Sequence, residues 1–229
     1  MKLDFYFDVI SPYTYFGFVV LSRYRRVWNL EISFKPFFLG GIMSGSGNTP
    51  PAMVPNRAQF LSEDLKRNVK WFDLEGKFLY MPSNFFAPEV NKVAMQLNRF
   101  LCLVMEDPQV SQDTRWKLVE ECFKFMWEDR GNRNDDNEFV PTEKVIETVC
   151  ERAGASELVK LIPKINFEGK KILTENTNAA LQLHAFGSPV LHFPENDAAI
   201  FFGSDRFEQI AFLFNLKWFG PRGLVNSRL

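Results

Sequence analysis

Residues 2–38 read KLDFYFDVISPYTYFGFVVLSRYRRVWNLEISFKPFF and decide the fold. Over residues 2–9 apolar side chains alternate with more polar ones, which is typical of a strand with one buried face. Ser11 and Pro12 follow, and both are preferred at the start of a helix, which we expect over residues 12–27. Residues 29–38 resemble a second strand. The stretch therefore has the strand–helix–strand order of a βαβ unit.

The middle of the chain is mostly helical in pattern. Residues 39–55 are rich in Gly and Pro and are expected to form a loop. Apolar residues at helical spacing then predict a series of helices, over residues 56–70, 88–105, 111–128, 142–153 and 156–162. A polar surface loop is expected at 129–138.

The pattern changes back after residue 165. We expect a helix over 175–186 with Gly187 as its C-cap, strands at 190–193 and 198–202, and a helix over 204–215. The order βαβ, helices, αββα predicts an α/β fold in which the outer parts complete one sheet. We expect one domain from residues 1–55 and 166–229, and an all-helical domain, residues 56–165, inserted in its middle.

Composition narrows the classes of function. Lys+Arg total 27 and Asp+Glu 28 in 229 residues, so the chain lacks the basic excess of a nucleic-acid or membrane-surface protein. With 2 His and 3 Cys, a multi-His metal site or a disulfide scaffold is not expected. No apolar run is long enough to predict a membrane span.

Ser11 is the first candidate for chemistry because it lies where a strand gives way to a helix. Backbone N–H groups and the helix dipole favour an anion there. Ser11 and Thr14 occupy the two places of a Cys-x-x-Cys redox motif, so the chain itself cannot perform thiol–disulfide exchange at this point. The Ser11 hydroxyl can instead hydrogen-bond a thiolate that a ligand brings. The alternative is an ordinary helix cap.

Two further segments adjoin strand ends. A cis peptide bond before Pro189 would turn the backbone of Ser188 toward a ligand, although a plain loop proline is the alternative. Ser204 and Asp205 can bind the charged groups of an amino acid, although Asp205 and Glu208 also have the spacing of a capping box. The ends of strands converge at one edge of an open sheet, so we expect these segments to meet.

Taken together, these residues resemble a known family. The order of elements is similar to the thioredoxin fold of the disulfide-oxidoreductase A type. Within that group the chain resembles the kappa-class glutathione transferases from about residue 3 to the end. The motifs that carry the resemblance are Asp8–Tyr13, Ser46–Pro51, Ala185–Pro189, Phe202–Arg206, Lys217–Pro221 and Asn226–Leu229.

The resemblance implies conjugation of glutathione to small hydrophobic electrophiles, without a metal and with a possible peroxidase side activity. Ser11 matches the catalytic serine, which would hold the glutathione sulfur as a thiolate. The positions matching the glutathione site are Asn48, Arg57, Asp64, Ser188, Pro189, Ser204, Asp205 and Arg206. Arg57 stands where the family carries a Lys, and Ser188 stands where relatives commonly have a larger apolar residue. The family forms homodimers.

Several alternatives stay open from the sequence. A related group uses the same fold and glutathione to isomerise hydroxychromene carboxylates, and a non-catalytic binding or chaperone-like protein would keep the fold as well. The electrophile site is expected among Phe16, Phe37, Phe38, Trp71, Phe85 and Phe86, each of which is otherwise a core residue. The terminal Ser227-Arg228-Leu229 resembles a peroxisomal address, with mitochondrial or cytosolic location as alternatives.

Overall fold

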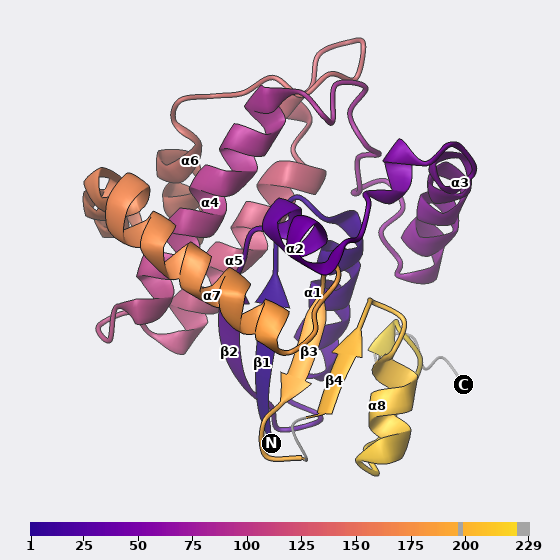
Figure 1. Cartoon of the computed structure of the whole chain (residues 1–229). Coiled ribbons are helices and arrows are strands. Elements are labelled where there is room, and N and C mark those ends of the chain that lie inside the picture. Colours follow the sequence, from indigo (N-terminus) through magenta and orange to yellow (C-terminus); the bar gives the residue numbers. More distant parts are fainter. Residues whose placement is uncertain (197–198, 224–229) are drawn as a thin grey trace.

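The computed structural model describes residues 1–196 and 199–223, and its centre is a mixed four-stranded sheet in the order β2-β1-β3-β4 (Figure 1). Strand β1 (Lys2–Phe7) runs parallel to β2 (Glu31–Pro36) and antiparallel to β3 (Val190–Phe193). Strand β4 (Ala199–Phe202) pairs antiparallel with β3 at the edge. The two ends of the chain therefore complete one sheet, and the predicted α/β thioredoxin-like fold is confirmed.

Helix α1 (Pro12–Tyr24) connects β1 to β2, as the βαβ pattern predicts. The segment between β2 and β3 holds the larger helices α3 (Pro55–Trp71), α4 (Pro88–Glu106), α5 (Gln112–Trp127), α6 (Val145–Ala153) and α7 (Lys170–Gln182). Shorter helical segments are η1 (Pro51–Met53), η2 (Arg130–Asn132), the 3-10 helix η3 (Ser156–Lys164) and the π-helical η4 (Ile165–Gly169). None of the described helices is both long and apolar enough to cross a membrane.

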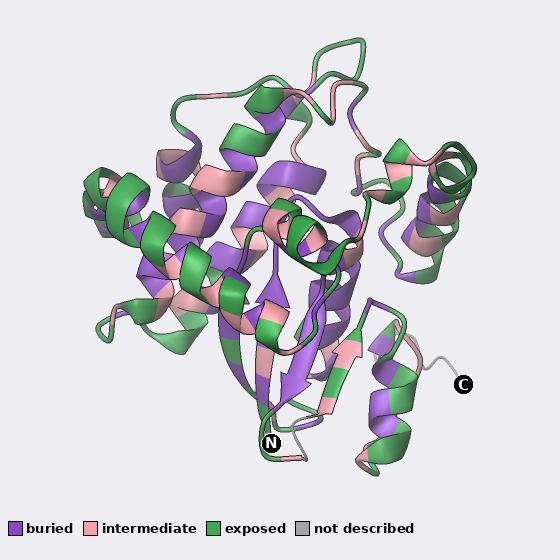
Figure 2. Cartoon of the chain, in the orientation of Figure 1, coloured by how far each residue is buried: buried purple, intermediate pink, exposed green. Residues whose placement is uncertain are grey.

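The central strand β3 is buried on both faces, whereas the edge strands β2 and β4 also carry exposed residues (Figure 2). One face presents Phe5, Phe7 and Phe34 to α1 and α5, where they contact Phe18, Trp116 and Phe123. The other face presents Tyr6 and Val190 to α2 (Leu39–Ser46) and α7. The fully buried phenylalanines account for much of the phenylalanine content: Phe5, Phe7, Phe16, Phe18, Phe37, Phe100, Phe123, Phe125, Phe139 and Phe193. Burial of so much aromatic surface is the main stabilising term of the fold.

The loop predicted at residues 39–55 is wrong in its first half, because α2 (Leu39–Ser46) is helical. Its glycines let the helix lie close to its neighbours. A Cβ at Gly45 would stand 2.7 Å from Leu181 Cδ1, and one at Gly41 would stand 3.1 Å from Thr177 Cγ2. Contact with α7 outweighs the low helix propensity of glycine, and local composition does not record that contact.

The C-terminal elements also differ from the predicted bounds. Helix α7 begins at Lys170 and ends at Gln182, where His184 takes a left-handed conformation, so Gly187 is not its C-cap. Helix α8 (Phe207–Leu213) begins after Arg206 without a side-chain cap, so the capping box predicted for Asp205 and Glu208 is absent. The predicted domain boundaries at residues 55 and 166 stay a prediction. One apolar cluster contains residues from both predicted domains, among them Phe5, Leu161 and Phe207.

Candidate functional site

Strand β1 leads into helix α1 (Figure 1), and Ser11, which lies between the two, is the N-cap of that helix. Its Oγ accepts a 3.3 Å hydrogen bond from the backbone N–H of Thr14, and only 6% of the residue is exposed. The hydroxyl hydrogen has no acceptor among the described residues. Because accepting the bond from Thr14 uses a lone pair and leaves the O–H free, Ser11 can donate to an anion at the positive end of the helix dipole.

Thr14 and Ser188 join this helix to the loop before β3. Their hydroxyl oxygens are 2.6 Å apart, and Ser188 Oγ also accepts from the Asp8 N–H at 3.3 Å. The Ser188 side chain is thus turned into the protein, and the Ser188–Pro189 bond is cis, as expected. The backbone N–H and C=O of Ser188 have no partner among the described residues. They are available to pair with an extended peptide ligand.

Gly17 brings a third segment to the same place. A Cβ at Gly17 would lie 3.1 Å from Pro189 Cγ and 4.0 Å from Ser204 Cα, so α1, the proline loop and the β4–α8 turn meet there. The Gly203 N–H donates to Pro189 O at 3.1 Å and fixes the turn. Ser204 is buried, whereas Asp205 is exposed and pairs with Arg206 at 3.3 Å. The turn therefore offers both charges to solvent beside the proline loop.

Asp64 is connected to the helix that bears Ser11 by a hydrogen bond from Tyr13. Tyr13 was not among the site residues predicted from the sequence. Tyr13 Oη donates to Asp64 Oδ2 at 2.6 Å, and Asn68 Nδ2 donates to the same oxygen at 2.8 Å. Burial chiefly, then Asp64 and the charge of Asp205, raise the pKa of Tyr13. Arg57 is exposed in the first turn of α3, seven residues before Asp64. That spacing is close to two turns, so Arg57 lies on the same side of α3 as Asp64.

Asn48 is joined to the loop that precedes Ser188. Its Nδ2 donates to Phe186 O at 2.6 Å, and its Oδ1 accepts from the Thr49 N–H at 2.8 Å. The structure thus brings Ser11, Ser188, Pro189 and Ser204 together, links Asp64 and Asn48 to them, and leaves Arg57, Asp205 and Arg206 exposed. Which of them bind a ligand stays a prediction.

Asp8 and Asn98 lie buried next to the segment that precedes Ser11. Neither of them was among the site residues predicted from the sequence. The buried Asp8 carboxyl accepts from the Leu39 N–H at 2.8 Å, the Ile10 N–H at 3.1 Å and Asn98 Nδ2 at 2.6 Å. Burial raises its pKa, and these hydrogen bonds oppose that rise. Asn98 interrupts the apolar face of α4, next to Leu97 and Leu101, and this was the available signal. The pair ties the loop before Ser11 to α2 and α4.

The aromatic residues predicted for the electrophile site do not form a single wall. Phe16 and Phe37 are fully buried and belong to two different core clusters. Phe38, Trp71 and Phe86 are exposed, and Phe85 is half-buried with its ring 5.2 Å from that of Phe86. Phe16 and Phe37 therefore fit the alternative that the sequence left open for them, which is a place in the core of the protein.

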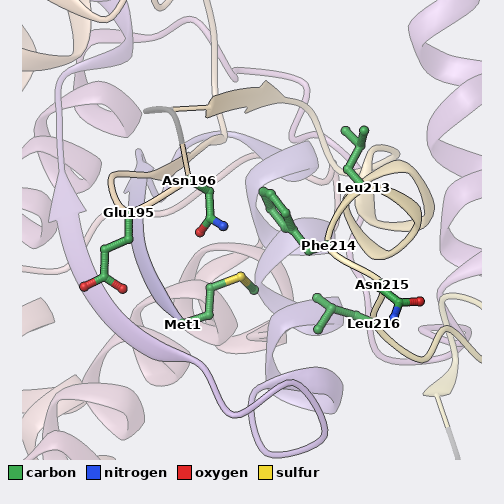
Figure 3. Close-up of a pocket in the computed structure, with 7 residues that line it drawn as sticks. All are labelled: Met1, Glu195, Asn196, Leu213, Phe214, Asn215 and Leu216. Carbon is green, nitrogen blue, oxygen red and sulfur yellow. The ribbon is translucent and has the colours of Figure 1, made fainter.

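An open hollow of about 660 Å³ lies at the opposite end of the sheet (Figure 3). Its walls are Met1, Glu195 and Asn196 on one side and Leu213–Leu216 on the other. Ser11 follows the carboxyl end of β1, whereas Met1 precedes its amino end, so the hollow is remote from the candidate site. Among residues 1–196 and 199–223 no cluster of three or more His, Cys, Asp or Glu could hold a metal.

Comparisons with known proteins agree with this geometry. A family model described as a DsbA-like thioredoxin domain matches residues 2–214. Glutathione S-transferase kappa 1 of Rattus norvegicus is 35% identical over 99% of this chain and 97% of its own length. The Homo sapiens protein of the same name is 31% identical over 99% of this chain and 97% of its own length. A solved 2-hydroxychromene-2-carboxylate isomerase superposes with a TM-score of 0.71 at 20% identity, covering 94% of this chain and 95% of that one.

Proposed function

We propose a function from one premise: the chain belongs to the kappa-class glutathione S-transferases, which have a DsbA-like thioredoxin fold. On that premise it is an enzyme that joins the sulfur of glutathione to an electrophile. The observation that carries the proposal is the Ser11 hydroxyl, buried at the start of α1 with its hydrogen free to donate.

Ser11 would stabilise the thiolate form of glutathione. A free thiol has a pKa of about 8.5 and is mostly protonated at neutral pH. One hydrogen bond to a charged group is worth roughly 1.5–3 kcal/mol, which lowers a pKa by about one to two units. The thiol proton leaves to solvent, the sulfur lone pair forms the bond to the electrophilic carbon, and the leaving group departs with its bonding electrons. In an addition, those electrons move onto the acceptor instead.

The remaining predicted residues suit the other groups of the tripeptide. The backbone N–H and C=O of Ser188, which have no partner within residues 1–196 and 199–223, would bind the cysteinyl backbone in the manner of an added strand. Ser204, Asp205 and Arg206 would bind the γ-glutamyl end, since a hydroxyl and both charge signs stand together in that turn. Asn48, Arg57 and Asp64 would lie toward the glycyl end, where Arg57 can bind a carboxylate bidentately.

Glutathione-dependent isomerisation of a hydroxychromene carboxylate is the second candidate, because it would use the same fold and the same thiolate. It is less well supported, since the isomerase superposes at 20% identity while the transferase relatives reach 35%. Turnover of an aryl halide compared with that of a chromene substrate separates the two. A non-catalytic glutathione-binding or chaperone-like protein would turn over neither.

Three finer properties belong to the same proposal. We propose a role in detoxification with peroxidase activity as a side reaction, tested with an organic hydroperoxide. We propose a homodimer, as the resemblance implies, and sedimentation velocity at several concentrations tests it. We propose a peroxisomal location from Ser227-Arg228-Leu229, which lies outside the described residues.

Substitution of Ser11 by Ala tests the central step. We expect the pKa of bound glutathione, followed by thiolate absorbance, to rise by about one to two units, with conjugation at mildly acidic pH falling about 10- to 100-fold. Glutathione affinity should change little. The matched control is Ser22→Ala in the same helix. The Ser22 hydroxyl donates to Val19 O over a distance of 2.7 Å and has no hydrogen bond to any residue of the candidate site. Full activity of the Ser11→Ala enzyme would overturn the mechanism.

A further inference from the structure

The segment Lys217–Gly223, which we call the C-terminal strap, is bound along α1. Tyr24 Oη donates to Gly220 O and accepts from the Phe219 N–H, both at 2.7 Å. Trp28 Nε1 donates to Lys217 O at 2.7 Å, and the Trp218 ring stacks on Tyr24 with centroids 4.8 Å apart. These contacts hold the strap in one place although it contains no strand or α-helix. They also explain the Lys217–Pro221 motif as a structural element.

Two arginines join the strap to the carboxyl end of α3. Arg23 donates to Pro221 O in the strap and to Phe72 O just after α3, both at 2.8 Å. Arg222 donates to Lys70 O at 2.6 Å and to Trp71 O at 3.4 Å. The last carbonyls of a helix lack partners within it and carry partial negative charge, so two guanidinium groups are well matched to them.

Helix α3 carries two of the residues expected at the glutathione site, Arg57 and Asp64. Its apolar face, Leu61, Leu65 and Val69, joins the core, and Tyr13 holds Asp64. Arg57 stands about 20 Å along the helix from Lys70, at a rise of 1.5 Å per residue. A tilt of about 5° at the carboxyl end would therefore move Arg57 by nearly 2 Å, and ligand contacts need placement within about 0.5 Å.

We infer that the strap is a positioning element of the glutathione site, with Arg222 and Arg23 fixing the carboxyl end of α3 and hence the place of Arg57 and Asp64. Neither arginine needs to touch glutathione for this role. The inference rests on the proposed function, because it assigns α3 to the glycyl side of the tripeptide.

The test is Arg222→Ala in the full chain, with glutathione Kd, KM and kcat measured together. We expect Kd and KM for glutathione to rise about three- to tenfold, which is less than the loss of one direct hydrogen bond to a charged group, because Arg222 acts on the ligand only through α3. The value of kcat and the pH midpoint of conjugation should stay within about twofold and a few tenths of a unit, since Ser11 is untouched. Amide exchange in α3 should become faster. Arg222→Lys keeps the cation and should restore part of the affinity.

Arg26→Ala is the matched control, because Arg26 is exposed near the end of α1 and its guanidinium makes no hydrogen bond to the described residues. It should leave every parameter unchanged. Tyr24→Phe is a second route to the same effect, since it releases the strap without touching α3, and it should raise Kd likewise.

The inference would be overturned if the Arg222→Ala variant had the glutathione Kd of the wild type and unchanged amide exchange in α3. It would also be overturned if the variant lost kcat, shifted the pH midpoint of conjugation and lowered the Tm in parallel, because such a result indicates general destabilisation. If the wild-type protein binds no glutathione, the proposed function fails, and faster α3 exchange in Arg222→Ala still decides whether the strap fixes this helix.

Discussion

Tyr13 Oη donates a 2.6 Å hydrogen bond to Asp64 Oδ2 and so connects the first turn of α1 to the middle of α3. Ser11 stands two residues before Tyr13, and Arg57 stands two helical turns before Asp64. Burial chiefly, and the hydrogen bond with Asp64 next, raise the pKa of Tyr13 far above neutrality. Tyr13 is therefore a permanent donor that sets the distance between the helix bearing Ser11 and the helix bearing Arg57.

Tyr13→Phe should lower the affinity for glutathione about three- to tenfold. It should also lower the free energy of unfolding by about 1–2 kcal/mol, because one hydrogen bond to a carboxylate is lost while Asn68 still donates to Asp64. Titration calorimetry and urea unfolding measure the two effects. Tyr80→Phe is the control, since Tyr80 is exposed and its hydroxyl bonds to no described residue. Equal affinities for wild type and Tyr13→Phe would show that this connection does not shape the site.

Asp8→Asn should remove one pH-dependent contribution to stability. Burial raises the pKa of Asp8, so the folded protein retains this proton at pH values where the unfolded chain, with a pKa near the usual ~3.9, has lost it. The wild-type contribution of Asp8 to stability therefore falls as pH rises from that value through the raised one. Asn does not titrate, so the wild-type advantage over Asp8→Asn should shrink over that window.

Urea unfolding at several pH values measures this difference, with the exposed Asp113→Asn as control. At low pH the variant should be less stable than wild type by about 1–3 kcal/mol, because an amide NH2 would face the Leu39 N–H donor. A wild-type advantage that grows with pH would contradict the burial argument.

Gly17→Ala should separate stability from binding. Ala favours a helix over Gly by roughly 0.5–1 kcal/mol, which offsets part of the strain of a Cβ placed 3.1 Å from Pro189 Cγ. We expect the Tm to change by only a few degrees while glutathione KM rises severalfold, since the proline loop must shift. Thermal unfolding and steady-state kinetics decide this. An unchanged KM would mean that the loop moves without cost to the ligand.

Deletion of Ser227–Leu229 should release the protein from peroxisomes to the cytosol without changing kcat or KM, because the strap ends before these residues. Fluorescence microscopy of a fusion at the amino terminus measures the distribution. Changing Leu229 alone to Asp should have the same effect. An unaltered distribution would remove the peroxisomal proposal.

Local patterns predicted the elements whose signals lie within them. The βαβ start, the Ser11 cap and strand β3 are examples, since alternation and capping act over a few residues. The sequence could not show that Gly41 and Gly45 seat a helix on α7, because that depends on residues far along the chain. The hydrogen bonds between Tyr13 and Asp64 and between Asp8 and Asn98 could not be predicted for the same reason.

The strap also has a consequence for the order in which the protein can be made. Tyr24 and Arg23 in α1 donate hydrogen bonds to Gly220 and Pro221 in the strap. A ribosome delivers Gly220 196 residues after Tyr24, and contacts of such long range form late. A nascent chain that still lacks the strap therefore holds the carboxyl end of α3 through Arg23 and not through Arg222, and full affinity for the ligand should arise only once the strap has been made.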